Sequence, residues 1–181
     1  MEEMKRLLDN GVKEIIIGGI DVGSYEDPHE EKAYRLKNLL REMAEYAPEK
    51  HFRIRVSSIE CSQIDDEYIS LFHDYPNRLC PHFHIPLQSG SEKILIKMNR
   101  KYRLEDFYSM TEKIKKNITN VALSTDVISG FPGETDEDFK NTYEFIKKVG
   151  FMRIHAFPYS EREGTVASRI KEGIVRMDIR R

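Results

Sequence analysis

The stretch Asp126-Val-Ile-Ser-Gly-Phe-Pro-Gly-Glu-Thr135 decides the fold. An apolar, β-branched run, Val121 to Ile128, leads into it and ends in a Ser-Gly-Phe-Pro-Gly turn. Thr135, with Asp138 three residues later, has the form of a capping box at the start of a helix. Strand, glycine turn and helix N-terminus in this order are typical of α/β proteins, which present backbone donors to a ligand at the carboxyl end of a strand.

Strands and helices alternate along the rest of the chain. Apolar runs predict strands over residues 12–20, 51–57, 81–87, 121–128 and 151–157. Amphipathic spacing predicts helices over 1–10, 31–46, 91–98, 104–117 and 135–148, with a loop over 21–30. In the last helix we expect an inward face of Phe139, Tyr143, Ile146 and Val149. This alternation predicts an α/β fold with a parallel sheet of about five strands, either open and doubly wound or part of a βα barrel.

Composition excludes several classes of protein. The 181 residues suffice for one domain, and a net charge of −2 with 33% charged residues excludes a strongly basic nucleic-acid binder. No run of about 18 apolar residues is present, so we expect no membrane span. The N-terminus lacks the pattern of a signal peptide. The two cysteines, Cys61 and Cys80, predict buried thiols in a reducing, cytoplasmic setting.

Small polar residues and glycines follow every predicted strand. Ordinary turn geometry explains any single one of these turns. Because the carboxyl ends of parallel strands meet at one edge, five such turns together indicate a shared cofactor-binding rim. The turns are Gly18-Gly19-Ile20-Asp21, Ser57-Ser58-Ile59-Glu60, Gln88-Ser89-Gly90-Ser91, Ser129-Gly130-Phe131-Pro132 and Pro158-Tyr159-Ser160.

Three polar side chains within the strands leave alternatives open. Asp126 lies in an otherwise apolar strand, so it either pairs with Arg53 or Arg55 or lines a cavity. His82 and His84 point to one face and, with Asp126, could serve an unrelated βα-barrel metal-dependent lyase. A core histidine pair is the commoner arrangement, because no further ligand has a supporting spacing. The residues alone therefore predict an α/β cofactor-binding domain.

Six collinear motifs resemble the radical S-adenosylmethionine (SAM) methylthiotransferases. They include Arg78-Leu-Cys-Pro-His-Phe-His-Ile-Pro-Leu-Gln-Ser-Gly-Ser91, Met98-Asn-Arg-Lys-Tyr102 and the stretch quoted first, and together they occupy residues 11–25, 53–60, 78–91, 98–102, 125–135 and 155–165. The sequences of these motifs are most similar to those of the MtaB branch, which acts on threonylcarbamoyladenosine in tRNA. The MiaB branch, acting on isopentenyladenosine in tRNA, and the RimO branch, acting on a ribosomal protein, are the alternatives.

The resemblance implies a partial (βα)6 barrel. Residues 1–165 would supply strands 2 to 6 of this radical SAM core, and residues 166–181 a linker toward a C-terminal RNA-binding domain of the TRAM type. The partners implied are tRNA and a flavodoxin- or ferredoxin-type electron donor, with no membrane.

The resemblance also implies that the rim holds SAM. Its methionine amino group would lie at Gly18, Gly19 and Asp21, and its carboxylate and ribose at Ser57, Ser58 and Glu60. The ribose side would further contact Gln88 and Ser89. The adenine or ribose would pack on Ile128 and Gly130, with backbone contacts from Phe157, Pro158 and Tyr159. Asp126 and Arg162 would be pocket residues without an assigned role.

The family's Cys-x-x-x-Cys-x-x-Cys loop, which holds the [4Fe–4S] cluster that cleaves SAM, does not occur in the sequence. Residue 1 falls just after the expected place of that loop. We therefore expect an internal fragment that carries no catalytic residue and no metal ligand, and that is inactive by itself. In the intact enzyme, the resemblance implies that one SAM donates a methyl group to a sulfur of an auxiliary cluster. A second SAM yields an adenosyl radical that removes hydrogen from C2 of the adenine, where the methylthio group is placed.

Overall fold

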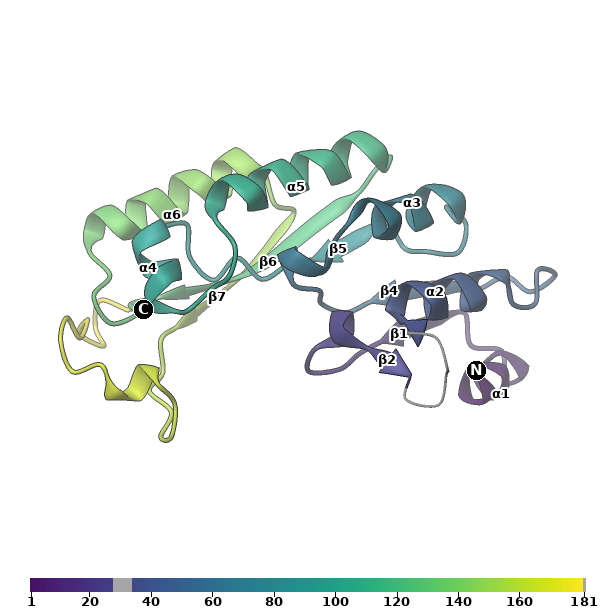
Figure 1. Cartoon of the computed structure of the whole chain (residues 1–181), viewed down its shortest axis with the longest axis horizontal. Coiled ribbons are helices and arrows are strands. Elements are labelled where there is room, and N and C mark those ends of the chain that lie inside the picture. The colour runs from purple at the N-terminus through teal and green to yellow at the C-terminus, as the bar shows by residue number, and fades with distance from the viewer. Residues whose placement is uncertain (28–33, 181) are drawn as a thin grey trace. The chain divides into compact units, whose positions relative to one another are not determined.

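Helices alternate with short parallel strands in the computed structural model, which describes residues 1–27 and 34–180 (Figure 1). The chain forms two units, Met1–His84 with Lys113–Ala122, and Ile85–Glu112 with Leu123–Arg181. Each unit contains its own parallel strand pair, which confirms the α/β class. The continuous parallel sheet of about five strands stays a prediction. No helix in the described part of the chain is long and apolar enough to span a bilayer.

The first unit is built on the parallel pair β1 (Glu14–Ile17) and β4 (Arg53–Val56), in the register Glu14↔Arg53 to Ile17↔Val56. Its helices are α1 (Glu2–Asp9), α2 (Leu36–Glu45) and α3 (Asp66–Asp74), and it contains β5 (His82–His84). Aromatic rings form much of its core, with the Phe72 and Phe83 centroids 4.5 Å apart. Leu40, Ile54, Leu71 and Tyr68 are fully buried beside them.

Three boundaries in this unit differ from the prediction. The first strand is shorter than residues 12–20, because the ladder with β4 ends at Ile17. The loop predicted over 21–30 contains a 3₁₀ turn, Val22–Ser24, and β2 (Glu26–Asp27), which pairs antiparallel with β3 (Tyr34–Arg35). The helix predicted over 31–46 starts only at Leu36, after β3. Residues 28–33 of these two segments lie outside the described residues.

The second unit is built on β6 (Ala122–Ser129) and β7 (Arg153–Pro158), paired in parallel from Ser124↔Arg153 to Ser129↔Pro158. Its helices are α4 (Glu92–Lys97), α5 (Leu104–Asn117, up to Glu112 in this unit) and α6 (Asp136–Val149). Residues 85–88 run alongside β6, where Ile85 N donates to Ser124 O at 2.9 Å and Gln88 N to Asp126 O at 2.8 Å. Pro86 between them has no N–H to donate, so this edge is not a full strand.

The buried face of α6 is offset from the prediction. Phe139 and Tyr143 are each 54% exposed, whereas Asp138, Thr142 and Val149 are buried. Figure 1 shows α6 along the β6–β7 pair. Hydrogen bonds of Asp138 and Thr142 to the segment 89–93 fix the rotation of the helix, so its polar side chains face inward. Hydrophobic spacing was therefore right for Val149 and wrong for Phe139 and Tyr143.

Candidate cofactor-binding site

A cavity of about 640 Å³ opens in the second unit where β6, β7 and the segment 85–88 end. This volume lies within the range of small-molecule sites in proteins. Six of the residues expected to hold a cofactor line it together, namely Gln88, Asp126, Ile128, Phe157, Pro158 and Tyr159. These residues come from three separate parts of the sequence, and parallel pairing brings their carboxyl ends to one place.

Gln88 is held in the cavity wall by a strained backbone. Its φ is +63°, in the left-handed region that residues other than glycine avoid. Two hydrogen bonds to β6 fix this conformation, from Gln88 N to Asp126 O and from Ile128 N to Gln88 O, both 2.8 Å. Strain of this kind persists only where the surroundings impose it, and it is concentrated at functional sites.

Asp126 lines the cavity, which confirms the second of the two alternatives for this residue. Its Oδ1 lies 3.1 Å from Nδ1 of His155, its directly opposite neighbour on β7. Arg55 and Arg53 instead contact Glu14 in the first unit, with Nε–Oε1 and Nη2–Oε2 distances of 2.7 and 3.5 Å.

Aromatic side chains form the apolar wall of the cavity. The rings of Phe131 and Tyr159 meet edge to face with centroids 5.2 Å apart, and Tyr159 N donates to Ser129 O at 2.8 Å. The Tyr159 hydroxyl is buried and has no hydrogen-bond partner in the described structure. Buried polar groups are nearly always satisfied, so this hydroxyl is an exception on the packed side of the ring.

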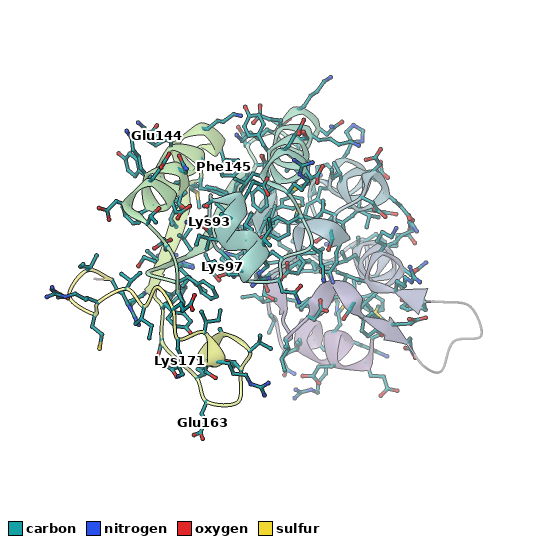
Figure 2. The ribbon with its side chains drawn as sticks, turned by 60° about the vertical axis from the view of Figure 1, so that its left-hand side comes forward. Lys93, Lys97, Glu144, Phe145, Glu163 and Lys171 are labelled. Carbon is teal, nitrogen blue, oxygen red and sulfur yellow. The ribbon has the colours of Figure 1, made fainter. Side chains whose placement is uncertain are left out.

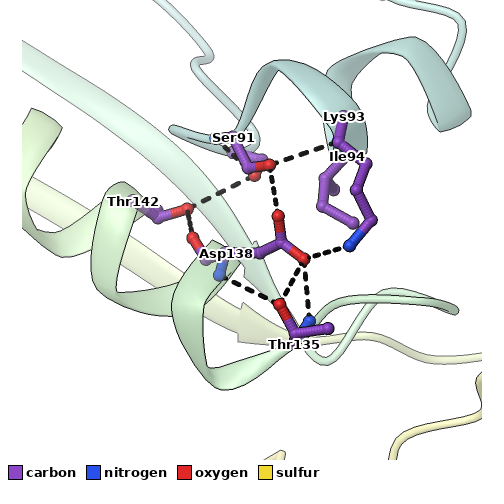
Figure 3. Close-up of polar contacts among 7 residues, drawn as sticks. Ser91, Lys93, Ile94, Thr135, Asp138 and Thr142 are labelled. Carbon is purple, nitrogen blue, oxygen red and sulfur yellow. Dashed lines mark hydrogen bonds and ion pairs between the residues drawn. The ribbon is translucent and has the colours of Figure 1, made fainter.

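A buried polar network joins the turn after Gln88 to the start of α6 (Figure 3). The Asp138 carboxylate accepts hydrogen bonds from Ser91 Oγ at 2.7 Å, Lys93 Nζ at 2.6 Å and Thr135 N at 2.9 Å. Burial acts to raise the pKa of Asp138, but the hydrogen bonds from Lys93, Thr135 and Ser91 outweigh it and hold the pKa below its usual range. The capping box predicted at Thr135 and Asp138 is confirmed.

Ser89 supports this turn from behind and does not line the cavity. Its side chain is fully buried, with Oγ 3.3 Å from Thr142 Oγ1, which also accepts from Gly90 N at 3.0 Å. A Cβ on Gly90 would lie 2.6 Å from Thr142 Cα, so only glycine allows α6 to approach this closely. Ser89 was expected to contact the ribose, but in the structure it contacts Thr142 of α6 instead.

Gly130 also lies outside this cavity. It lines a neighbouring cavity of about 420 Å³, and its φ is +72°. The side chain of Arg180 covers it, since a Cβ there would lie 2.4 Å from Arg180 Cγ. Ser129 Oγ donates to Arg180 O at 3.0 Å, and Gly133 N donates to Gly173 O at 2.7 Å. Part of the segment predicted as a linker therefore packs on the glycine turn.

The rim residues of the first unit follow two adjacent strands. Gly18, Gly19 and Asp21 come after β1, and Ser57, Ser58 and Glu60 come after β4. Gln63, which the sequence interpretation missed, joins the two loops. Its Nε2 donates to Asp21 Oδ1 at 2.8 Å, and its Oε1 accepts from Glu60 N at 3.0 Å. The hydrogen bond from Gln63 is the main reason why the pKa of Asp21 is lowered.

The cysteines do not fit an iron–sulfur cluster. Cys61 and Cys80 are both buried, as expected, and the Cys80 sulfur accepts a hydrogen bond from Arg53 Nε at 3.3 Å. Two thiols are fewer than the three thiolates of the cluster loop in the family that the sequence resembles. The cavity, in contrast, combines an apolar wall with the amide of Gln88.

Histidines 82 and 84 behave as partly buried core residues. Burial lowers the pKa of His82, and the charge of Arg55 and the neighbouring His84 lower it further. Both effects favour the neutral imidazole. For His82, this environment agrees with the commoner of the two arrangements expected from the sequence.

Comparison with known proteins identifies the family of this fold. The model of the radical SAM superfamily matches residues 1–146. The threonylcarbamoyladenosine tRNA methylthiotransferase MtaB of Bacillus subtilis is 44% identical over 174 residues, which cover 96% of this chain and 38% of the relative. The tRNA-2-methylthio-N(6)-dimethylallyladenosine synthase of Clostridium tetani is 41% identical over 173 residues, 96% of this chain and 37% of the relative. The chain thus spans less than two fifths of the length of these relatives.

Solved structures agree at the level of the fold. The radical S-adenosylmethionine methyltransferase TsrM from Kitasatospora setae has a TM-score of 0.68 at 17% identity, over 87% of this chain and 29% of that one. Elp3 of the archaeon Methanocaldococcus infernus has a TM-score of 0.58 at 19% identity, over 92% and 42%. The family model that matches residues 1–146 speaks against the hypothesis of an unrelated metal-dependent lyase. The chain belongs to the radical SAM superfamily.

Proposed function

We propose that this chain is the SAM-binding part of a tRNA methylthiotransferase, and that the modified nucleoside is threonylcarbamoyladenosine beside the anticodon. The observation that carries the proposal is the convergence of Gln88, Ile128 and residues 157–159 on one cavity. The 44% identity to the Bacillus subtilis enzyme supports this choice of nucleoside.

In this proposal the cavity holds the adenosine half of SAM. Ile128 and Phe157 cover a face of the base, while the Gln88 amide offers hydrogen bonds at its polar edge. The pairing of β6 with β7 presents the backbone of Pro158 and Tyr159 at the base edge. SAM, when bound in the complete enzyme, supplies the methyl group and the means of hydrogen abstraction.

The remaining machinery is not offered by these 181 residues. Both cysteines of the chain are buried. In this proposal, the thiolates that hold the cluster and the sulfur that is transferred come from protein outside this sequence. We therefore propose that the chain has no methylthiotransferase activity by itself. Its partners in the complete enzyme are tRNA and a flavodoxin- or ferredoxin-type electron donor.

A chimera tests the substrate. In MtaB of Bacillus subtilis, this chain replaces the matching segment of 174 residues, and the chimera is expressed in cells that lack their own enzyme. Mass spectrometry of tRNA nucleosides is expected to find the methylthio group on threonylcarbamoyladenosine. Its appearance on isopentenyladenosine instead, or on a ribosomal protein, would assign the chain to one of the alternative substrates. A folded chimera without any methylthio product would contradict the proposed function.

A further inference from the structure

Three cationic side chains line the cavity, Lys97, Arg100 and Arg162, and two of them, Lys97 and Arg162, have no partner for their charged group among the described residues. Lys97 is the last residue of α4, and Arg162 lies in the loop after β7. Both are exposed, and neither makes a hydrogen bond or ion pair through its charged group with a residue in 1–27 or 34–180. Figure 2 shows Lys97 beside Lys93 on α4. Lys93 differs because its ammonium bonds to Asp138.

The glycine turn leaves room for the Lys97 ammonium. Gly133 has a φ of +87°, and a Cβ added there would lie only 1.9 Å from Lys97 Nζ. A side chain at position 133 would therefore displace the ammonium from the cavity wall. Asn99, two residues after Lys97, lines the same cavity in a left-handed conformation with φ of +57°.

The cavity is polarised as a result. Ile128, Phe131 and Phe157 supply apolar surface, while Lys97, Arg100 and Arg162 supply positive charge. The one carboxylate in the lining, Asp126, is hydrogen-bonded to His155 at 3.1 Å. A ligand that combines an aromatic base with an anionic group matches this distribution.

We propose that Lys97 and Arg162 bind the phosphate backbone of the RNA strand on either side of the adenosine that is brought to the mouth of the cavity, next to the SAM adenosine held inside it. The inference rests on the proposed function, in which the cavity holds the adenosine half of SAM. An enzyme that modifies a base in RNA must draw that base out of its stack, and the flanking phosphates follow it to the mouth of the site. Contacts to phosphate position the strand without reading its sequence.

Salt dependence tests the proposal. The 181-residue chain is titrated with a fluorescent anticodon stem-loop RNA carrying adenosine 3′ to the anticodon, and anisotropy is measured between about 50 and 200 mM salt. Affinity falls as salt rises, and each lost phosphate contact makes the plot of log K against log salt less steep by about 0.7 for single-stranded RNA. The double variant Lys97→Ala/Arg162→Ala should therefore make this plot less steep by about 1.4. Affinity at the lowest salt should fall about tenfold. The matched control, Lys116→Ala/Lys140→Ala, removes two exposed lysines outside the cavity and should retain the wild-type slope.

The small ligands separate this proposal from the proposed function. Binding of 5′-deoxy-5′-methylthioadenosine, which has the adenosine of SAM without its carboxylate, is measured by NMR for the same proteins and should change less than twofold. An unchanged RNA slope in the double variant overturns the proposal, as does a wild-type chain that fails to bind the RNA at the lowest salt. A variant that loses SAM but retains methylthioadenosine shows that the cations hold the SAM carboxylate, and that too overturns it. If wild-type chain binds RNA with the expected slope but not methylthioadenosine, the proposed cofactor site fails instead.

Discussion

The Ser91 hydroxyl donates a 2.7 Å hydrogen bond to Oδ1 of Asp138, a residue 47 positions away in the sequence. Lys93 reaches the other oxygen of the same carboxylate at 2.6 Å. The contact fastens the turn that follows Gln88 to the N-terminus of α6. Because Gln88 forms part of the cavity wall, the position of this wall depends on a carboxylate that lies outside the cavity.

Replacement of Asp138 by Asn should destabilise the chain and flatten its acid response. The folded-state pKa is lowered, so the native state binds fewer protons than the unfolded state in acid. The carboxylate's contribution is therefore present above about pH 4, the unfolded value, and is lost as the pH falls below it. At pH 7 the variant should lose about 1–3 kcal/mol in urea unfolding. Asp136→Asn, at an exposed position of the same helical turn, should retain the wild-type profile. Identical pH profiles for Asp138→Asn and wild type would contradict this role.

Replacement of Gly130 by Ala should lower the free energy of unfolding more than the same change at Gly150. Both glycines have a left-handed φ, +72° and +69°, so the backbone penalty of about 1 kcal/mol is shared. A Cβ at Gly150 meets nothing within 4 Å, whereas at Gly130 it meets Arg180 Cγ at 2.4 Å. The clash should add about 1–3 kcal/mol to the loss in free energy of unfolding. The double variant Gly130→Ala/Arg180→Ala should recover part of this difference. Equal losses at the two glycines would show that Arg180 does not pack on the turn.

Replacement of Gln88 by Gly should raise the stability of the chain and weaken its binding of methylthioadenosine. Glycine adopts the φ of +63° without strain, so the melting temperature should rise by the equivalent of about 1 kcal/mol. The loss of the amide should weaken methylthioadenosine binding several-fold. Asn120→Gly is the matched control, since Asn120 has a φ of +55° and lies outside the cavity, and it should leave binding unchanged. A Gln88→Gly chain that binds as wild type would remove Gln88 from the site.

Anaerobic reconstitution with iron and sulfide should not give a [4Fe–4S] cluster on this chain. The sequence has two cysteines, and both are buried. We therefore expect far less than one cluster per chain, measured both by the visible charge-transfer absorbance of the cluster and by iron analysis. A stoichiometric cluster would mean that other side chains complete the ligand set.

The local chemistry of the sequence predicted the elements of the site well. The capping box at Thr135 and the apolar run before it required only neighbouring residues, and both occur in the structure. The strand ends at Gln88, Ile128 and Pro158 follow from parallel pairing, so their convergence was also predictable.

Contacts between distant residues could not be predicted in the same way. Ser89 was expected at the ribose, but its partner Thr142 lies 53 positions away on the buried polar face of α6. Arg180 packs on Gly130 from a segment whose composition indicated only a linker. The pairing of β2 with β3 involves two residues on each side, too few for any periodicity. In each case the information lies in the tertiary partner.

The most direct test of the account is a chemical-shift map of the isotope-labelled chain titrated with 5′-deoxy-5′-methylthioadenosine. The cluster ligands of SAM are absent from this probe, so the measurement depends only on the adenosine cavity. We expect weak, saturable shifts concentrated at Gln88, Ile128 and residues 157–159. Shifts concentrated elsewhere, or none at millimolar ligand on a folded chain, would contradict the assignment of this cavity to the cofactor.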